Sequence, residues 1–76
     1  MKYTVYTQPG CGACESLCER LRSRGHEVEV LTFETLSKME DIDRRNHLMA
    51  LIHNRDTTEV PILFANDEII AIRLAV

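Results

Sequence analysis

The chain has 76 residues, 45% of them hydrophobic and 28% charged, and its formal net charge at pH 7 is −3. So short a chain buries only about 60% of its unfolded surface, which predicts one small domain over residues 1–76. The negative charge argues against nucleic acid or an anionic membrane as the main partner. No stretch has the apolar run of a secretory signal or a membrane span, and three cysteines are too few for the disulfide framework of a small secreted protein. We therefore expect a cytoplasmic protein, and a monomer.

The first half of the chain predicts a strand, a helix and a second strand. Apolar and polar residues alternate over Lys2–Thr7, as in a half-buried strand, until Pro9-Gly10 interrupts the pattern. Over about Cys11–Arg24 the apolar residues recur every three or four positions, which indicates an amphipathic helix, with Gly25 in place to end it. A second strand is expected over Glu27–Phe33. Because a helix joins them, the two strands should be parallel, with a right-handed crossover.

The second half predicts a helix followed by two short strands. Ser37-Lys38-Met39-Glu40 has the Ser-x-x-Glu form of a capping box. The helix behind it should continue to about His53, with an apolar stripe made of Met39, Ile42, Met49 and Ile52. Ile62–Ala65 and Glu68–Arg73 are short apolar runs, and Asn66-Asp67 between them suits a hairpin turn. The expected order is β-α-β-α-β-β, an α/β fold whose last two strands are antiparallel.

Cys11 and Cys14 open the first helix at a spacing that suits reversible dithiol chemistry. Ideal helix geometry places their Cα atoms about 5 Å apart, within the range that a disulfide tolerates. The helix N-terminus favours a thiolate at Cys11 by about 0.3–2 kcal/mol, and favours one less at Cys14, a turn further in. Cys11 is therefore the expected attacking thiol and Cys14 the resolving thiol, with no cofactor needed because both cysteines store the redox equivalents. The small residues Gly12 and Ala13 leave room for a partner, and Gln8 is a candidate substrate contact.

Other interpretations of these residues remain open. The cysteine pair could be structural, or half of a zinc site with His47 and His53, although those histidines should lie on different sides of one helix. Cys18 lies on the apolar stripe and over 10 Å from Cys11 on ideal geometry, so it is either a buried small hydrophobe or a regulatory thiol. Tyr6 can belong to either face of its strand. The arginines of the first helix are expected on a solvated surface; they are Arg20, Arg22 and Arg24.

Several short motifs together carry a resemblance to a known family. They are Tyr6-Thr7 at a strand end, Cys-x-x-Cys opening a helix, Arg-x-x-Gly-His-Glu over Arg22–Glu27, and Val60-Pro61 before a strand. The chain resembles the glutaredoxin branch of the thioredoxin superfamily, and most closely the small glutaredoxin-like electron donors of ribonucleotide reductase. The resemblance implies a thioredoxin-like fold with a four-stranded mixed sheet.

The resemblance also implies roles and partners. Cys11 would be the nucleophile and Cys14 the resolving thiol, Pro61 would be a cis proline facing them, and the main chain of Val60 would pair with the bound substrate. By residue type alone Pro61 could be an ordinary trans proline. The implied partners are a protein disulfide, such as that of ribonucleotide reductase, and either thioredoxin reductase or glutathione as the electron source.

The chain departs from the family pattern near the expected site. Ile70-Ala71-Ile72 stands where glutaredoxins usually carry Gly-Gly, which argues against glutathione. Glu59 replaces the common Thr or Ser, and Thr58 and Glu59 either contact a partner or meet solvent. Only Arg73–Val76 follow the last expected strand, so the family's third helix should be absent or a single turn. Two other functions are therefore kept: an iron–sulfur or other metal-binding protein that uses Cys11 with an external thiol in a dimer, and a binding module without turnover.

Overall fold

The structure is a computed structural model that describes residues 1–55 and 59–76. In chain order its elements are β1 (Lys2–Tyr6), α1 (Gly12–Ser23), β2 (Glu27–Leu31), α2 (Phe33–Ser37), α3 (Ile42–His53), β3 (Ile62–Ala65), β4 (Glu68–Ile69) and the 3-10 turn η1 (Ile72–Leu74). The expected order of strands and helices is confirmed, with α2 as an addition.

The four strands form one mixed sheet in the order β2-β1-β3-β4. β1 and β2 are parallel, with Tyr3 opposite Val28, and β3 runs antiparallel to both β1 and β4. Asn66 and Asp67 form the turn between β3 and β4 with φ angles of 53° and 60°, as a two-residue hairpin loop requires. The predicted parallel pair, the hairpin and the thioredoxin-like mixed sheet are therefore confirmed.

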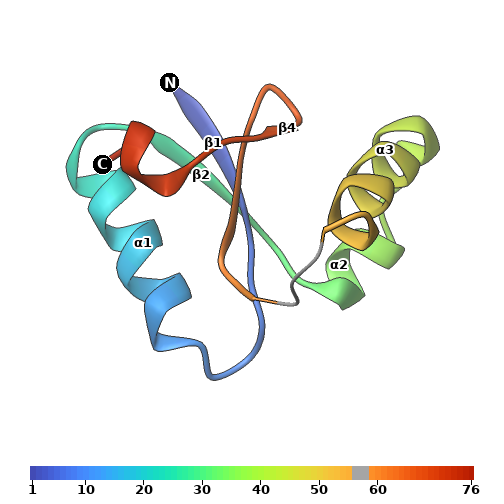
Figure 1. The fold of residues 1–76 in the computed structure, drawn as a ribbon, viewed down its shortest axis with the longest axis horizontal. Coiled ribbons are helices and arrows are strands. Elements are labelled where there is room, and N and C mark those ends of the chain that lie inside the picture. The colour runs from blue at the N-terminus through green and yellow to red at the C-terminus, as the bar shows by residue number, and fades with distance from the viewer. Residues whose placement is uncertain (56–58) are drawn as a thin grey trace.

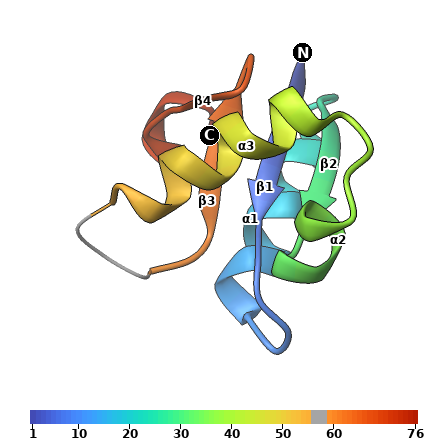
Figure 2. The same cartoon turned by 90° about the vertical axis from the view of Figure 1, so that its right-hand side faces the viewer.

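Helices lie on both faces of the sheet (Figure 1), and each face has its own hydrophobic core. α1 and the C-terminal turn cover one face, where the buried residues are Tyr3, Val5, Leu17, Cys18, Leu21, Leu63 and Ala75. α2 and α3 cover the other face, and Figure 2 shows α3 lying across β1 and β3. The buried residues there are Leu31, Leu36, Leu48, Ile62 and Phe64, with Tyr6 packed against them. Because successive strand residues point to opposite faces, neighbours such as Leu63 and Phe64 serve different cores.

β2 is shorter than the sequence predicts, because Thr32 caps a helix instead of continuing the strand. The Thr32 hydroxyl accepts a hydrogen bond from the Thr35 amide at 3.2 Å, and the Thr35 hydroxyl accepts one from the Thr32 amide at 2.7 Å. This reciprocal pair is a capping box, and it starts α2 at Phe33. The strand therefore ends at Leu31 and Phe33 is 64% exposed.

The capping box predicted at Ser37–Glu40 is wrong. Ser37 is the last residue of α2, and its hydroxyl donates to the Glu34 carbonyl at 2.8 Å. The next helix, α3, begins at Ile42, where the Asp41 carboxylate accepts a hydrogen bond from the Arg44 amide at 3.0 Å. The predicted apolar stripe is confirmed at Met39, Met49 and Ile52, which pack against the core on the α3 face of the sheet, but Ile42 is 48% exposed. Leu48, outside the predicted stripe, is fully buried.

The segment after β4 forms a single turn, one of the two forms expected for it. β4 ends at Ile69 rather than at Arg73, and only the 3-10 turn Ile72–Leu74 follows it. This turn still contributes to the core beside α1, because Ile72 and Val76 pack against it and Ala75 is 8% exposed. The turn therefore helps α1 to cover this face of the sheet.

Arg44 of α3 links three parts of the chain across the sheet. Its guanidinium donates to the Glu29 carboxylate of β2 at 2.6 Å and to the Asp67 carboxylate of the hairpin turn at 3.1 Å. Thr4 of β1 also donates to Glu29, at 2.9 Å. Only 24% of the Arg44 side chain and 29% of the Glu29 side chain are exposed, so solvent screens this pair less than it screens a surface ion pair.

Candidate active site

Cys11 occupies the N-cap of α1 and forms a disulfide with Cys14. The Cα atoms lie 5.3 Å apart, which confirms that the spacing suits a disulfide. The Cys14 amide donates a hydrogen bond to the Cys11 sulfur at 3.1 Å, and the Cys11 amide donates to the Gln8 carbonyl at 3.3 Å. Gly10, with φ at +75°, makes the turn that leads into this cap. The free amides of the first helical turn point toward a sulfur at this position and stabilise its thiolate form.

The two cysteines differ in their access to solvent. Cys11 is half-buried, whereas Cys14 is 2% exposed. Gly12 and Ala13 between them are both exposed, and a methyl group added at Gly12 would meet nothing within 4 Å. A reacting partner can therefore reach Cys11 from solvent, while Cys14 can be reached only from Cys11.

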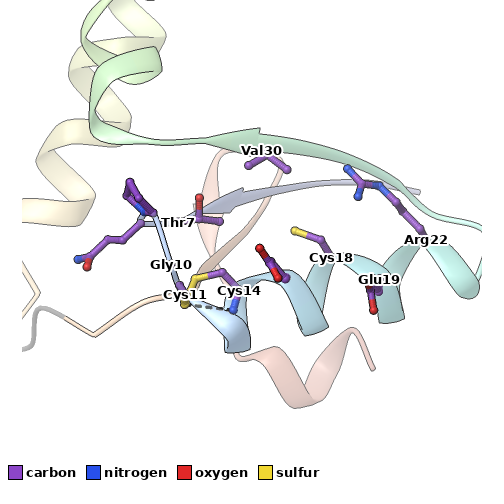
Figure 3. A pocket seen from close by; sticks show the side chains of 11 residues that line it. Thr7, Gly10, Cys11, Cys14, Cys18, Glu19, Arg22 and Val30 are labelled. Carbon is purple, nitrogen blue, oxygen red and sulfur yellow. Dashed lines mark hydrogen bonds between the residues drawn. A yellow bond between two sulfur atoms is a disulfide. The ribbon is translucent and has the colours of Figure 1, made fainter.

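A cavity of about 340 Å³ lies beside the disulfide, between α1 and the edge strand β2 (Figure 3). The loop after β1 closes one end, and Arg22 lies at the other end along α1. We call this cavity the α1–β2 groove; it is lined by Thr7, Gln8, Pro9, Gly10, Cys11, Cys14, Glu15, Cys18, Glu19, Arg22 and Val30.

Cys18 lies on the α1 side of this groove as a free, buried thiol. It is 5% exposed and packs in the core with Leu17 and Leu21. Burial raises the pKa of its thiol, and the nearby positive charge of Arg22 opposes that shift only in part. A thiol with a raised pKa is a poor nucleophile at neutral pH. This environment agrees with the expectation of a buried small hydrophobe.

The other residues expected at the site lie beside the groove. Gln8 also lines a second cavity, of about 290 Å³, with Val60 and with Tyr6, Ile52, His53, Arg55, Glu59 and Ile62. The Val60–Pro61 peptide bond is cis, as the resemblance implies. Pro61, however, lines neither of these two cavities; it borders a third one with the Ile69–Ile72 segment. Gln8 therefore lines both the cavity beside the disulfide and the cavity that contains Val60, whereas Pro61 lines only the third cavity.

The expectations for Thr58 and Glu59 have different outcomes. Thr58 lies outside the described residues. Glu59 is exposed, and its carbonyl accepts a hydrogen bond from Arg55 at 2.9 Å. This bond ties the segment before Val60 to the end of α3.

The histidines do not join the cysteines. His47 hydrogen-bonds through Nε2 to the Asp67 carbonyl at 2.8 Å, at the hairpin turn, whereas His53 borders the second cavity. Among residues 1–55 and 59–76, no three or more His, Cys, Asp or Glu side chains are grouped so that they could hold a metal ion. In the same residues no helix has the length and apolar character to cross a membrane.

Sequence reasoning located the disulfide but missed the groove beside it. Arg22 was expected only on a solvated surface, and Val30 only as a strand residue, yet both line the cavity. Val30 is 43% exposed at the edge strand. No local pattern signals this proximity, because the groove forms only when α1 packs over the parallel β1–β2 pair.

Comparison with known proteins agrees with this geometry. A family model described as glutaredoxin matches residues 3–70, which include all of α1 and, apart from Lys2 of β1, all four strands of the sheet. Searches of curated proteins and of solved structures found no match. Proteins of this family in general act on disulfides and exchange electrons with glutathione or a reductase. The matched range, the mixed sheet and the disulfide at the N-terminus of α1 place the chain in the glutaredoxin family.

Proposed function

We propose that this protein is a thiol–disulfide oxidoreductase that reduces disulfides in a protein partner. Cys11 acts as the nucleophile and Cys14 as the resolving thiol, with Gly12, Ala13, Gln8, Val60 and Pro61 around the bound substrate. The observation that carries the proposal is the unequal placement of the pair: Cys11 is a half-exposed helix cap and Cys14 is 2% exposed behind it.

The reaction proceeds in two exchange steps. The Cys11 thiolate attacks one sulfur of the partner's disulfide, so that a Cys11–partner bond forms and the partner's own S–S bond breaks. The departing sulfur leaves with the electron pair and takes a proton from water. Cys14 then loses its proton and attacks the Cys11 sulfur, which releases the second partner thiol and forms the Cys11–Cys14 disulfide. The partner gains two electrons from the two cysteines and two protons, one from Cys14 and one from water, the latter replacing the proton that Cys11 released when its thiolate formed.

The helix N-terminus supports both steps. The amides of the first turn, including the Cys14 amide 3.1 Å from the Cys11 sulfur, stabilise the thiolate that attacks. The same amides stabilise Cys11 as a leaving group when the disulfide is reduced again. A Cα separation of 5.3 Å allows the ring to close without moving the chain.

The sequence resemblance suggests the partners. Ribonucleotide reductase is a candidate substrate and the cytoplasm the expected compartment. Thioredoxin reductase is favoured over glutathione as the electron source, because Ile70-Ala71-Ile72 stands where the family usually has Gly-Gly. A coupled assay that supplies either NADPH with thioredoxin reductase or reduced glutathione with its reductase separates the two sources.

Cysteine variants test the proposal directly. Cys11→Ser should lose all turnover of a disulfide substrate above the uncatalysed rate. Cys14→Ser should stall after the first step and accumulate a mixed disulfide at Cys11, and mass spectrometry of that adduct identifies the partner. Cys18→Ala is the matched control and should keep turnover. Full activity in Cys11→Ser would disprove the assignment of the nucleophile, and an inert wild-type protein would favour a binding module without turnover.

A further inference from the structure

The α1–β2 groove offers a partner chain a path that starts at the reactive sulfur. Cys11 lies at one end of the groove and Arg22 at the other, with the edge strand β2 as the opposite wall (Figure 3). Val30, which is 43% exposed, and Pro9 and Gly10 supply the apolar part of the lining. A polypeptide whose disulfide is at Cys11 can therefore continue alongside α1.

Two carboxylates that form no ion pair among the described residues line this path. Glu15 and Glu19 are exposed residues of α1 that border the groove. Within the described part of the chain, neither forms an ion pair. Arg22 is the cation that borders the groove, and it lies beyond both of them, further from Cys11. The part of the groove nearest the disulfide is therefore acidic.

The spacing of these carboxylates matches an extended chain. With a helical rise of 1.5 Å per residue, Glu15 lies about 6 Å from Cys11 along the axis of α1, and Glu19 about 12 Å. An extended chain advances about 3.3 Å per residue, and alternate side chains point the same way. The second and fourth residues from the attacked cysteine would therefore reach Glu15 and Glu19 with side chains on one face. Arg22, about 16 Å along, would be reached by the fifth residue.

From this match we infer that the groove selects protein disulfides flanked by basic side chains, with Lys or Arg at the second and fourth positions from the attacked cysteine. This selectivity rests on the proposed attack by Cys11, and it specifies the charge of the partner segment next to the attacked disulfide. The carboxylates attract the cations and hold the partner chain alongside α1.

Matched peptides test this selectivity. Each short peptide carries one cysteine joined by a disulfide to thionitrobenzoate, with Lys, Gln or Glu at the second and fourth positions on both sides. Attack by Cys11 of the reduced protein on the peptide sulfur releases coloured thionitrobenzoate, and its rate is measured in single-turnover experiments. An exposed ion pair contributes roughly a 1.5- to fivefold effect, so the Lys peptide should react about two- to thirtyfold faster than the Gln peptide. Raising the salt concentration to about 0.5 M should bring the ratio close to one.

Variants of the protein locate the effect in the groove. Glu15→Gln combined with Glu19→Gln should bring the Lys-to-Gln rate ratio close to one; taking a ratio cancels any change in the reactivity of Cys11. Glu40→Gln, which removes an exposed carboxylate outside the groove, should leave the ratio unchanged. Arg22→Gln should not lower it.

The outcomes separate this inference from the function on which it rests. Equal rates for the Lys and Gln peptides, a faster Glu peptide, or a preference that survives in the double variant would overturn the selectivity and leave the proposed reductase activity intact. No reaction with any peptide or with 2-hydroxyethyl disulfide, by contrast, would overturn the proposed activity and the selectivity with it.

Discussion

Cys11, Cys14 and Cys18 follow one another along α1, and only Cys11, at the helix N-terminus, is partly exposed, whereas Cys14 and Cys18 are buried. The Cys11 sulfur accepts a hydrogen bond from a helix amide and is accessible to solvent. Cys14 is buried and bonded to Cys11, and Cys18 packs in the core with Leu17 and Leu21. Identical side chains thus acquire three different reactivities, because helix position and burial act on the thiolate in opposite directions.

At neutral pH, iodoacetamide should alkylate Cys11 of the reduced protein and leave Cys18 unmodified. The reason is that burial raises the pKa of the Cys18 thiol, so at neutral pH its thiolate is scarcer than that of an ordinary cysteine. Peptide mapping by mass spectrometry measures each site, and the same protein unfolded in urea is the control in which Cys18 reacts. Equal alkylation of Cys11 and Cys18 in the folded protein would contradict the burial argument.

At the scale of elements, the boundary between β2 and α2 depends on one side chain. The pattern of alternating residues alone extends the strand to Phe33, but the Thr32 hydroxyl competes with the strand by accepting a hydrogen bond from the Thr35 amide. The turn at Thr32 allows α2 to bury Leu36 against the sheet, and Leu36 is 1% exposed.

Thr32→Ala should therefore destabilise the protein by about 1 kcal/mol, the usual cost of losing an N-cap hydroxyl. Ser37→Ala is the matched control: it removes a hydroxyl from the end of α2, not from a cap, and should cost less than about 0.5 kcal/mol. Urea denaturation of both variants gives the two free energies of unfolding. Equal losses would mean that Thr32 is not the residue that starts α2.

At the scale of the whole molecule, Arg44 joins α3 to the edge strand β2 and to the β3–β4 turn. Its partners Glu29 and Asp67 lie on different sides of it in the sequence, 15 and 23 residues away. The contact orients α3 over its face of the sheet.

Arg44→Met should lower the free energy of unfolding by about 1–3 kcal/mol, because it leaves the carboxylate of Glu29 partly buried without its cation. The control is Lys38→Met, which breaks an ion pair with Glu34 whose side chains are 73% and 75% exposed. That change should cost at most about 0.5 kcal/mol. If urea denaturation gave the two variants the same stability, the Arg44 contacts would add no more than a surface pair.

The same contact makes stability depend on pH. The Arg44 hydrogen bond holds the pKa of Glu29 below its ordinary value, and the Thr4 hydroxyl adds to this effect. A carboxyl with a depressed folded-state pKa contributes stability above its unfolded pKa, and this contribution is lost as the pH falls through the folded-state value. Stability should therefore decline in acid, and Glu29→Gln should flatten that decline. Urea midpoints across acid pH measure it; an unchanged slope in Glu29→Gln would assign the decline to other groups.

Local physics explains the parts of the fold that the sequence predicts correctly. The alternation in Lys2–Tyr6, the three- and four-residue spacing in α1, and the Asn66-Asp67 turn each depend on neighbours along the chain. The cap position of Cys11 follows from the same local rules. The errors occurred at Thr32 and Ser37: the Thr32 hydroxyl caps α2 where the alternating pattern continues the strand, and α3 is capped by Asp41 instead of by Ser37.

The sequence by itself therefore determined the order of elements and the placement of two cysteines at a helix start, since hydrogen bonding and sterics within a few residues decide these. The parallel pairing of β1 and β2 was also predictable, because a helix connects the two strands. Only the tertiary structure decided what surrounds the disulfide. Val30 lines the α1–β2 groove together with Cys11 and Glu19, and Val60 lines the adjoining cavity together with Gln8. These contacts join residues far apart in the chain, so they arise from how helices pack on the sheet, which no local pattern encodes.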